Sequence, residues 1–341
     1  MQLSIIIPVY NTSKYLNRCL DSVINARIDN SEIIVINDGS TDNSEEIIKE
    51  YLNKYSFIRY ISKQNEGLGA TKNLGIKEAK GKYLSFIDSD DSINPNFYKD
   101  AINYMNDDYD LIVYDFLSIE KDKEYTTYAK DPIFKNLSDY EGILYTTIMP
   151  SSCNKIMKKE VITKSNVLFP QGLRYEDFAT TPVYLLNSKK VKYLNKPYYN
   201  YYINENSIMH KKNINYDMSY VLKLLDSRLK KYNNYDRDKF VFYNYIWRLE
   251  SFLLNPLYTL SLKDRFKYSI KLYKNNHNIF RNINKNKYVI ESLNNFDDKT
   301  KDFIIKRNKL LASHNILGFN YFLFKNARET KIYDIENKYY D

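Results

Sequence analysis

The sequence is poor in cysteine, which excludes several classes of protein. It contains two cysteines, Cys19 and Cys153, which lie far apart and belong to no CxxC or Cys/His array. A disulfide framework and a structural zinc site are therefore not expected, and a reducing compartment is the natural environment. Hydrophobic residues make up 43% and charged residues 27% of the chain, close to globular averages, which argues against wholesale disorder, collagen-like repeats and a low-complexity polymer.

Long apolar runs are also missing. No stretch approaches the roughly 18 uninterrupted apolar residues that a membrane span needs, and even FLLNPLYTLSL is cut by Asn255 and Pro256. The N-terminal segment MQLSIIIPVYNTSKYL lacks the basic region and cleavage site of a secretory signal. We therefore expect a cytoplasmic protein that can touch the inner face of a membrane without crossing it.

Two common nucleotide-binding signatures are absent. The first apolar run is followed by PVYNTS, and the chain contains neither GxGxxG nor GxxxxGK followed by Ser or Thr. A nicotinamide-dependent dehydrogenase and a phosphate-loop nucleotidase are therefore disfavoured.

Positive charge is concentrated toward the C-terminus. The chain has a net charge of +9, but residues 1–210 hold 25 basic and 28 acidic side chains, whereas residues 211–341 hold 26 basic and 14 acidic ones. Such a basic segment suits an anionic partner: a lipid face, a phosphate-rich polymer or a nucleic acid.

Strand and helix patterns alternate through the first third of the chain. Strands are predicted at Leu3–Val9, Glu32–Asn37, Phe57–Ser62, Tyr83–Ile87 and Leu111–Phe116. Helices are predicted at Tyr15–Ile24, Asp42–Tyr51, Ala70–Ala79 and Asn94–Met105, the second opened by a capping box of Asp42 and Glu45. This alternation is typical of an α/β fold with a parallel sheet, in which ligands bind beyond the carboxyl ends of the strands.

The pattern changes along the rest of the chain. Residues 118–150 are polar and predicted to be irregular apart from a helix at Ser138–Thr147, a further helix is predicted to begin near Glu176, and Lys192–Tyr202 is predicted to form one or two strands. From about residue 213 the apolar spacing is helical, with many lysines on the opposite side. We therefore predict two domains, an α/β domain over residues 1–212 and a mainly helical, basic domain over residues 213–341.

The most specific cluster is SFIDSDD, in which an apolar strand delivers three carboxylates at its carboxyl end. Asp88 and Asp90 project to the same side if the strand geometry continues, so negative charge gathers at the sheet edge. Oxygen ligands of this kind suit Mg²⁺ or Mn²⁺. The alternative interpretation is a solvated acidic turn that precedes the helix at Asn94.

Polar residues follow the other strands too. They are Pro8, Tyr10 and Asn11 at the end of the first strand, Asp38 after the second, and Asn65, Gly67 and Lys72 after the third. Gly67 permits close backbone approach, Asp38 can accept hydrogen bonds from a base or ribose, and Lys72 can meet a phosphate. Each is an ordinary turn residue by itself, but together they predict a binding site at one rim of the sheet.

With these motifs the sequence resembles glycosyltransferase family 2, whose pattern runs as IIIPVYN, an Asp-Gly-Ser turn, an N-x-G segment and an Asp-x-Asp after a fourth strand. The resemblance implies a GT-A (Rossmann-like) fold, with a nucleotide-sugar-binding half over residues 1–116 and an acceptor and base half over residues 117–212. It also implies a nucleotide-sugar site made from Pro8, Tyr10, Asn11, Asp38, Asn65, Gly67, Lys72, Asp88 and Ser89. In that site Tyr10 and Asp38 would hold the uracil and ribose of a UDP-sugar, and Asp90 with Asp88 would hold Mn²⁺ or Mg²⁺.

A second carboxylate pair lies at Glu176 and Asp177. Helix capping explains many such pairs, but the resembled family's Glu-Asp motif supplies the catalytic base, so we expect Asp177 to be the base, with Glu176 as its rival. The implied reaction is inverting transfer of a hexose or N-acetylhexosamine to a hydroxyl of a glycan, lipid-linked or protein-linked acceptor in the synthesis of bacterial cell-surface polysaccharides or glycoconjugates.

One position departs from the family pattern. Tyr202 stands where the family commonly has arginine, so a phosphate-binding guanidinium cannot be assigned there, and His210, Lys211 or Lys212 can substitute. The basic C-terminal helices can contact a membrane surface or an acceptor, or form a dimer interface. The alternative function is a basic protein that binds nucleic acid or another anionic polymer without transferase activity. It leaves the acidic first half unexplained, so no nucleic-acid partner is expected.

Overall fold

The computed structural model describes residues 1–121, 123–129, 148–203, 217–233 and 298–313, together with scattered residues between 261 and 321. The chain divides into two compact units, residues 1–212 and residues 213–341. The predicted helix at Ser138–Thr147 and the residues His210, Lys211 and Lys212 lie outside the described part of the chain.

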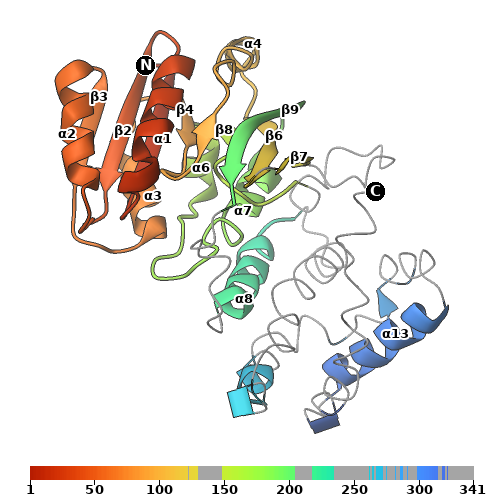
Figure 1. Cartoon of the computed structure of the whole chain (residues 1–341). Coiled ribbons are helices and arrows are strands. Elements are labelled where there is room, and N and C mark those ends of the chain that lie inside the picture. The colour runs from red at the N-terminus through yellow and green to blue at the C-terminus, as the bar shows by residue number, and fades with distance from the viewer. Residues whose placement is uncertain are drawn as a thin grey trace. The chain divides into compact units, whose positions relative to one another are not determined.

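The first unit is built on a nine-stranded sheet with the order β3-β2-β1-β4-β8-β6-β9-β5, in which β7 pairs with β6 (Figure 1). Its first four strands are β1 Leu3–Val9, β2 Ser31–Asn37, β3 Ile58–Ser62 and β4 Tyr83–Phe86. These strands are mutually parallel where they pair. The predicted α/β class is confirmed, and the carboxyl ends of these strands meet at one rim of the sheet.

The remaining strands make the sheet mixed rather than parallel. They are β5 Ser92–Ile93, β6 Leu111–Glu120, β7 Lys123–Thr127, β8 Lys155–Lys158 and β9 Val191–Tyr202. Strand β8 lies antiparallel between β4 and β6, and β5 pairs antiparallel with β9. The prediction that residues 118–150 begin as an irregular segment is wrong, since β6 and β7 form an antiparallel hairpin there.

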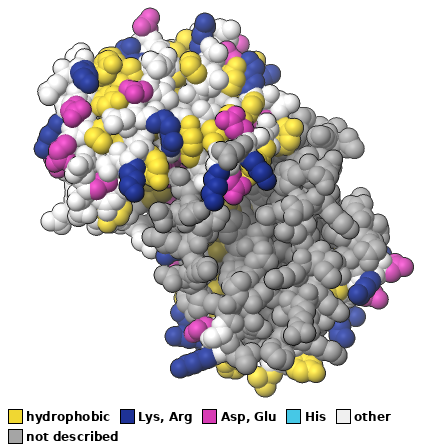
Figure 2. Space-filling view, viewed as in Figure 1, with side chains coloured by type: hydrophobic (Ala, Val, Ile, Leu, Met, Phe, Trp, Pro, Cys, Tyr) yellow, Lys and Arg dark blue, Asp and Glu magenta, His cyan; other side chains and the backbone are white. Residues whose placement is uncertain are grey.

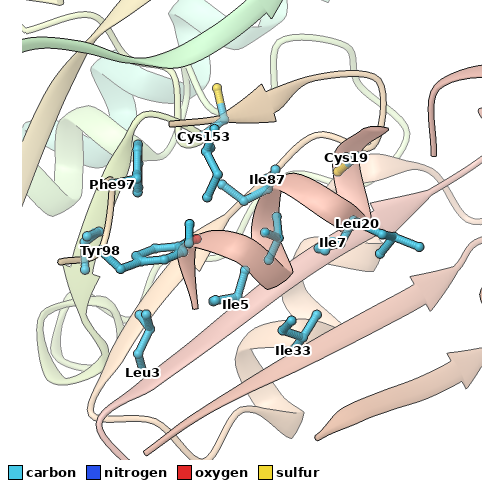
Figure 3. Packing of buried hydrophobic residues seen from close by; sticks show 14 of the residues in the cluster. Leu3, Ile5, Ile7, Cys19, Leu20, Ile33, Ile87, Phe97, Tyr98 and Cys153 are labelled. Carbon is cyan, nitrogen blue, oxygen red and sulfur yellow. The ribbon is translucent and has the colours of Figure 1, made fainter. Parts of the chain in front are cut away.

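Helices cover both faces of the parallel strands. The helices of this unit are α1 Ser13–Ala26, α2 Ser44–Lys54, α3 Leu68–Glu78, α4 Ile102–Asn106, α6 Lys159–Ser165 and α7 Thr181–Asn187. Alternate residues of a strand point to opposite faces. Accordingly, Ile5 and Ile7 pack in one cluster with Leu20 of α1 (Figure 3), whereas Ile6 points the other way and lies against Gly75 of α3.

Two predicted helix starts are wrong. Helix α2 begins at Ser44 without a capping box: the carboxylate of Asp42 accepts from the backbone N–H groups of Ser13 and Ser44, and Glu45 pairs with Lys49. Residues 95–101 form turns, so the helix predicted at Asn94–Met105 is reduced to α4. Phe97 and Tyr98 are neighbours in sequence and both fully buried.

In the second unit, α8 Asp217–Leu229 and α13 Asp298–Ala312 are helices, as predicted for this segment. Helix α8 buries Met218, Val221, Leu222, Leu225 and Leu229, at the three- and four-residue spacing of an amphipathic helix. On the face shown in Figure 2, basic and acidic side chains of the described residues are interspersed. Among the described residues, no helix combines the length and the apolar character needed to span a membrane.

Replacement of Gly75 by alanine should destabilise the first unit. A Cβ at this position would lie 2.4 Å from Cγ2 of the buried Ile6, and overpacking of this kind costs about 1–3 kcal/mol of unfolding free energy. Urea denaturation of Gly75→Ala measures the loss, with Lys77→Ala on the exposed side of the same helix as the control. Equal stability of both variants would contradict the described packing of α3 on β1.

Candidate active site

The turn at residues 88–91 follows β4 at the rim where the parallel strands end. The backbone N–H of Asp91 donates to the carbonyl of Asp88 at 3.0 Å, which closes the turn. The carboxylate of Asp91 is already engaged, because it accepts from the Tyr199 hydroxyl at 2.8 Å and from the Tyr202 backbone N–H at 3.0 Å. Of the three carboxylates in the turn, those of Asp88 and Asp90 are therefore the ones available to a ligand.

The environment of Asp88 and Asp90 fits a bound cation. Oδ1 of Asp88 is buried and has no hydrogen-bond partner. Burial raises the pKa of Asp88, and burial together with the nearby Asp88 charge raises the pKa of Asp90 to about 6. In the described part of the chain no group of three or more His, Cys, Asp or Glu side chains forms a metal site, so a cation held here would also need water or substrate oxygens, as Mg²⁺ usually does.

Asp38, at the end of β2, organises the loop that follows β3. One of its carboxylate oxygens contacts the Lys63 ammonium at 2.5 Å and the Glu66 backbone N–H at 3.0 Å, and the other accepts from the Gly67 backbone N–H at 2.9 Å. Gly67 has a positive φ of 88°, and Asn65 is exposed in the same loop. The nucleotide-binding roles of these three residues stay predictions.

The end of β1 lies beside the Asp38 turn. Asn11 has a positive φ of 53°, and its side-chain oxygen accepts from the Thr41 backbone N–H at 2.7 Å. Tyr10 is 50% exposed and open to a ligand, whereas Pro8 is a buried member of β1. Ser89 is buried, and its hydroxyl accepts from the Thr12 hydroxyl at 2.9 Å. Tyr10 is thus the member of this group whose side chain is most open to a nucleotide base.

Lys72 of α3 forms a buried ion pair with Glu176. Its ammonium lies 2.7 Å from Oε1 of Glu176 and 2.9 Å from the Ser152 hydroxyl oxygen, and both charged side chains are almost fully buried. Burial opposes the charge on Lys72, but the negative charges of Glu176, Asp88 and Asp177 outweigh it and raise the pKa of Lys72. The Lys72 charge, predicted to meet a phosphate, is therefore paired within the protein.

Asp177 differs from its neighbour Glu176 in its contacts. The two residues lie in a turn before α7 rather than in the first turn of a helix, so the helix start predicted near Glu176 is wrong. Oδ1 of Asp177 accepts from the backbone N–H of Phe178 at 2.9 Å. Burial, followed by the negative charge of Glu176, raises the pKa of Asp177 to about 7. A carboxyl group with this pKa is suited to accept a proton near neutral pH.

Sequence reasoning missed Lys155 at the start of β8. Its side chain is fully buried, and its ammonium donates to the carbonyls of Met149 and Ser151, both at 2.7 Å, and to the side-chain oxygen of Asn154 at 2.8 Å. Burial lowers the pKa of Lys155 to about 7. Through these three hydrogen bonds Lys155 holds the loop in which Ser152 contacts Lys72. Lysines are rarely buried, so no sequence signal pointed to this role.

Comparison with known proteins places these residues in a family. Residues 4–165 match Glycosyl transferase family 2. The uncharacterised glycosyltransferase YibD of Escherichia coli (strain K12) is 31% identical over 257 residues, which cover 71% of this chain and 74% of that protein. This chain belongs to glycosyltransferase family 2. Family membership favours a transferase over the alternative of a polymer-binding protein without such activity.

A further relative and a solved structure extend this comparison, the first by sequence and the second by fold. Glycosyltransferase GlyG of Streptococcus pneumoniae serotype 4 is 29% identical over 244 residues, which cover 67% of this chain and 79% of that protein. The crystal structure of S. aureus TarS 1-349 in complex with UDP-GlcNAc has a TM-score of 0.75 and 21% identity, and the match covers 96% of this chain and 92% of that one. The GT-A fold implied by the sequence motifs is confirmed.

The Lys72–Glu176 pair should make single substitutions costly. Lys72→Met leaves the Glu176 carboxylate buried and unpaired, and breaking a buried pair in this way typically costs about 3–5 kcal/mol. The double variant Lys72→Met/Glu176→Gln should be more stable than Lys72→Met alone, because no charge is then left unpaired. Urea denaturation of the single and double variants tests this.

Lys49→Met is the matched control, because Lys49 forms an ion pair at 2.9 Å with Glu45 on the exposed side of α2. Little change in stability is expected there. A Lys72→Met protein as stable as Lys49→Met would show that the buried pair is not formed.

Proposed function

We propose that this protein transfers a hexose or N-acetylhexosamine from a UDP-sugar to an acceptor hydroxyl with inversion of the anomeric configuration. The observation that carries the proposal is that the carboxylates at this rim have different environments. Asp88 and Asp90 are open to a ligand. Glu176 is paired with Lys72, whereas Asp177 has a pKa raised to about 7. The complex of TarS with UDP-GlcNAc supports a uridine diphosphate donor for a protein of this fold.

Asp177 acts as the general base in this proposal. A sugar hydroxyl is a weak nucleophile near neutral pH, so a carboxylate within hydrogen-bonding reach must accept its proton while the new C–O bond forms and the bond to UDP breaks. Glu176 is the less suitable base, because the Lys72 ammonium occupies its carboxylate. A single displacement without a covalent intermediate on the protein inverts the anomeric carbon.

Asp88 and Asp90 would hold Mn²⁺ or Mg²⁺ in the donor complex. A divalent cation there stabilises the negative charge that the departing diphosphate accumulates. Tyr10 and the loop after β3, shaped by Asp38, then offer the uracil and ribose a surface beside the diphosphate. Binding of the UDP-sugar in this proposal therefore does not require the general base Asp177.

The acceptor side of the proposal is broader. It comprises a glycan, lipid-linked or protein-linked hydroxyl used in building a bacterial cell-surface polysaccharide or glycoconjugate on the cytoplasmic side of the membrane. The 26 basic side chains of residues 211–341 suit peripheral contact with an anionic lipid surface. The same basic segment is a candidate interface for a homo-oligomer.

Substitutions of Asp90, in the proposed cation site, and of Asp177, the proposed base, should have different effects on donor binding and on transfer. Asp90→Ala should lose Mn²⁺-dependent binding of the UDP-sugar, measured by calorimetry. Asp177→Asn should keep that binding and lower the transfer rate by about 10²- to 10⁴-fold, the usual contribution of a general base. A screen of UDP-sugars for Mn²⁺-dependent thermal stabilisation of the wild type identifies the donor for both measurements.

The rate of Asp177→Asn decides the base assignment, because Glu176→Gln would also leave the buried Lys72 ammonium unpaired. Transfer by Asp177→Asn at the wild-type rate would remove Asp177 as the base and promote Glu176. Undiminished Mn²⁺-dependent donor binding by Asp90→Ala would remove the cation site from the acidic turn.

Transfer should also depend on pH with a defined sign. The base must be ionised, and the pKa of Asp177 is raised to about 7 by burial and by Glu176 and Asp88, with Lys72 and Lys155 opposing. The value of kcat/KM should therefore fall about tenfold per pH unit below pH 7, when it is measured from pH 5 to 9 with saturating Mn²⁺. A flat profile down to pH 5 would show that no group with this pKa accepts the proton.

A further inference from the structure

Each residue of the acidic turn is held by a contact from outside the turn. The backbone N–H of Asp88 donates to the Tyr199 hydroxyl at 3.2 Å, and that hydroxyl donates onward to Asp91. The Ser89 hydroxyl is bonded to Thr12. The remaining contact, at Asp90, comes from an arginine of α1 that no motif had marked.

That arginine is Arg18. Its Nη2 donates to the backbone carbonyl of Asp90 at 2.5 Å, and its guanidinium carbon lies 3.4 Å from the ring centroid of Tyr202. Its Nε is buried and has no hydrogen-bond partner. The flat guanidinium is thus held between an aromatic ring at the end of β9 and the main chain of the turn, an arrangement that an ammonium cannot reproduce.

Tyr202, which stands where the family commonly has arginine, has a structural contact of its own. It offers no guanidinium of its own, but its ring holds the guanidinium that α1 supplies. Its backbone N–H also binds Asp91 at 3.0 Å, and its hydroxyl lies 3.4 Å from the Ser92 hydroxyl oxygen. Arg18 and Tyr202 together fasten the second half of the turn, from Asp90 to Ser92, to α1 and β9.

We propose that Arg18, stacked on Tyr202, is a positioning residue that fixes the acidic turn so that Asp88 and Asp90 can bind one divalent cation together. This inference rests on the proposed function, in which these two carboxylates hold Mn²⁺ or Mg²⁺. The guanidinium bonds the main chain of Asp90 and leaves the carboxylate open, which is the arrangement a positioning role requires.

Charge and geometry predict opposite results for this arginine. The positive charge of Arg18 repels a cation, so if charge alone mattered, Arg18→Met would bind Mn²⁺ more tightly and Arg18→Lys would bind it as the wild type does. If Arg18 positions the turn, both variants bind Mn²⁺ more weakly, because neither keeps the planar stack and its hydrogen bond to Asp90.

The experiment titrates Mn²⁺ by calorimetry into the full chain saturated with UDP. Arg18→Lys and Arg18→Met should each weaken Mn²⁺ binding by about tenfold. Tyr202→Leu should weaken it similarly, and the double variant Arg18→Lys/Tyr202→Leu should show little further loss, because both changes remove the same contact. If Tyr202→Leu does not fold, the two Arg18 variants decide.

Arg27→Lys is the matched control. Arg27, just past the end of α1, also lies over an aromatic ring, with its guanidinium carbon 4.1 Å from the centroid of Phe57, and its Nε is also buried without a partner. The Arg27→Lys variant should bind Mn²⁺ as the wild-type protein does. In the absence of metal, its melting temperature should match that of the Arg18→Lys variant.

Two results would overturn the inference alone: wild-type Mn²⁺ affinity in Arg18→Lys, or tighter binding in Arg18→Met. An equal loss in Arg27→Lys would also overturn it, since a general loss of stability would then explain the effect. A wild-type protein that binds no Mn²⁺ in the presence of UDP would instead overturn the cation site of the proposed function, and this inference with it.

Discussion

The candidate site depends on the buried contact between Lys72 and Glu176. Two charges removed from water are unfavourable unless they meet closely and find further hydrogen bonds, and here they meet at 2.7 Å with the Ser152 hydroxyl as an additional partner. The residues are 104 positions apart in sequence, so the pair forms only when α3 and the turn before α7 are both in place. The position of Asp177, next in the chain, is thereby tied to the parallel part of the sheet.

A glycine makes this contact sterically feasible. A Cβ on Gly69 would lie 2.3 Å from the backbone oxygen of Pro170 and 3.6 Å from Cβ of Glu176. The first turn of α3 can therefore approach the segment 170–177 only because residue 69 has no side chain. Lys72, one turn further along α3, then reaches Glu176. The loop before β8, shaped by the Lys155 ammonium, completes the enclosure by presenting Ser152.

Much of this arrangement could be predicted from the sequence, because apolar runs set the strands and polar residues follow them at the ends. The run Leu3–Val9 has the predicted bounds, and the parallel pairing brings the predicted strand ends to one rim. Strand β8 could not be predicted in this way, because its four residues begin and end with lysine and Lys155 is buried. Pattern reasoning treats lysine as exposed, and it cannot tell that the three oxygens this lysine binds come from the loop just before it, at residues 149, 151 and 154.

The same limit explains why the sequence left two candidates for the base. Glu176 and Asp177 are adjacent carboxylates, and no spacing rule separates them. Their surroundings do: the Lys72 ammonium occupies Glu176, whereas Asp177 accepts from the backbone N–H of Phe178 and is desolvated beside other negative charges. Neighbouring titratable groups whose surroundings shift their pKa values apart can take different roles in acid–base chemistry. In the proposed mechanism, the choice of Asp177 over Glu176 as the base therefore rests on a contact from α3 and not on the Glu-Asp motif itself.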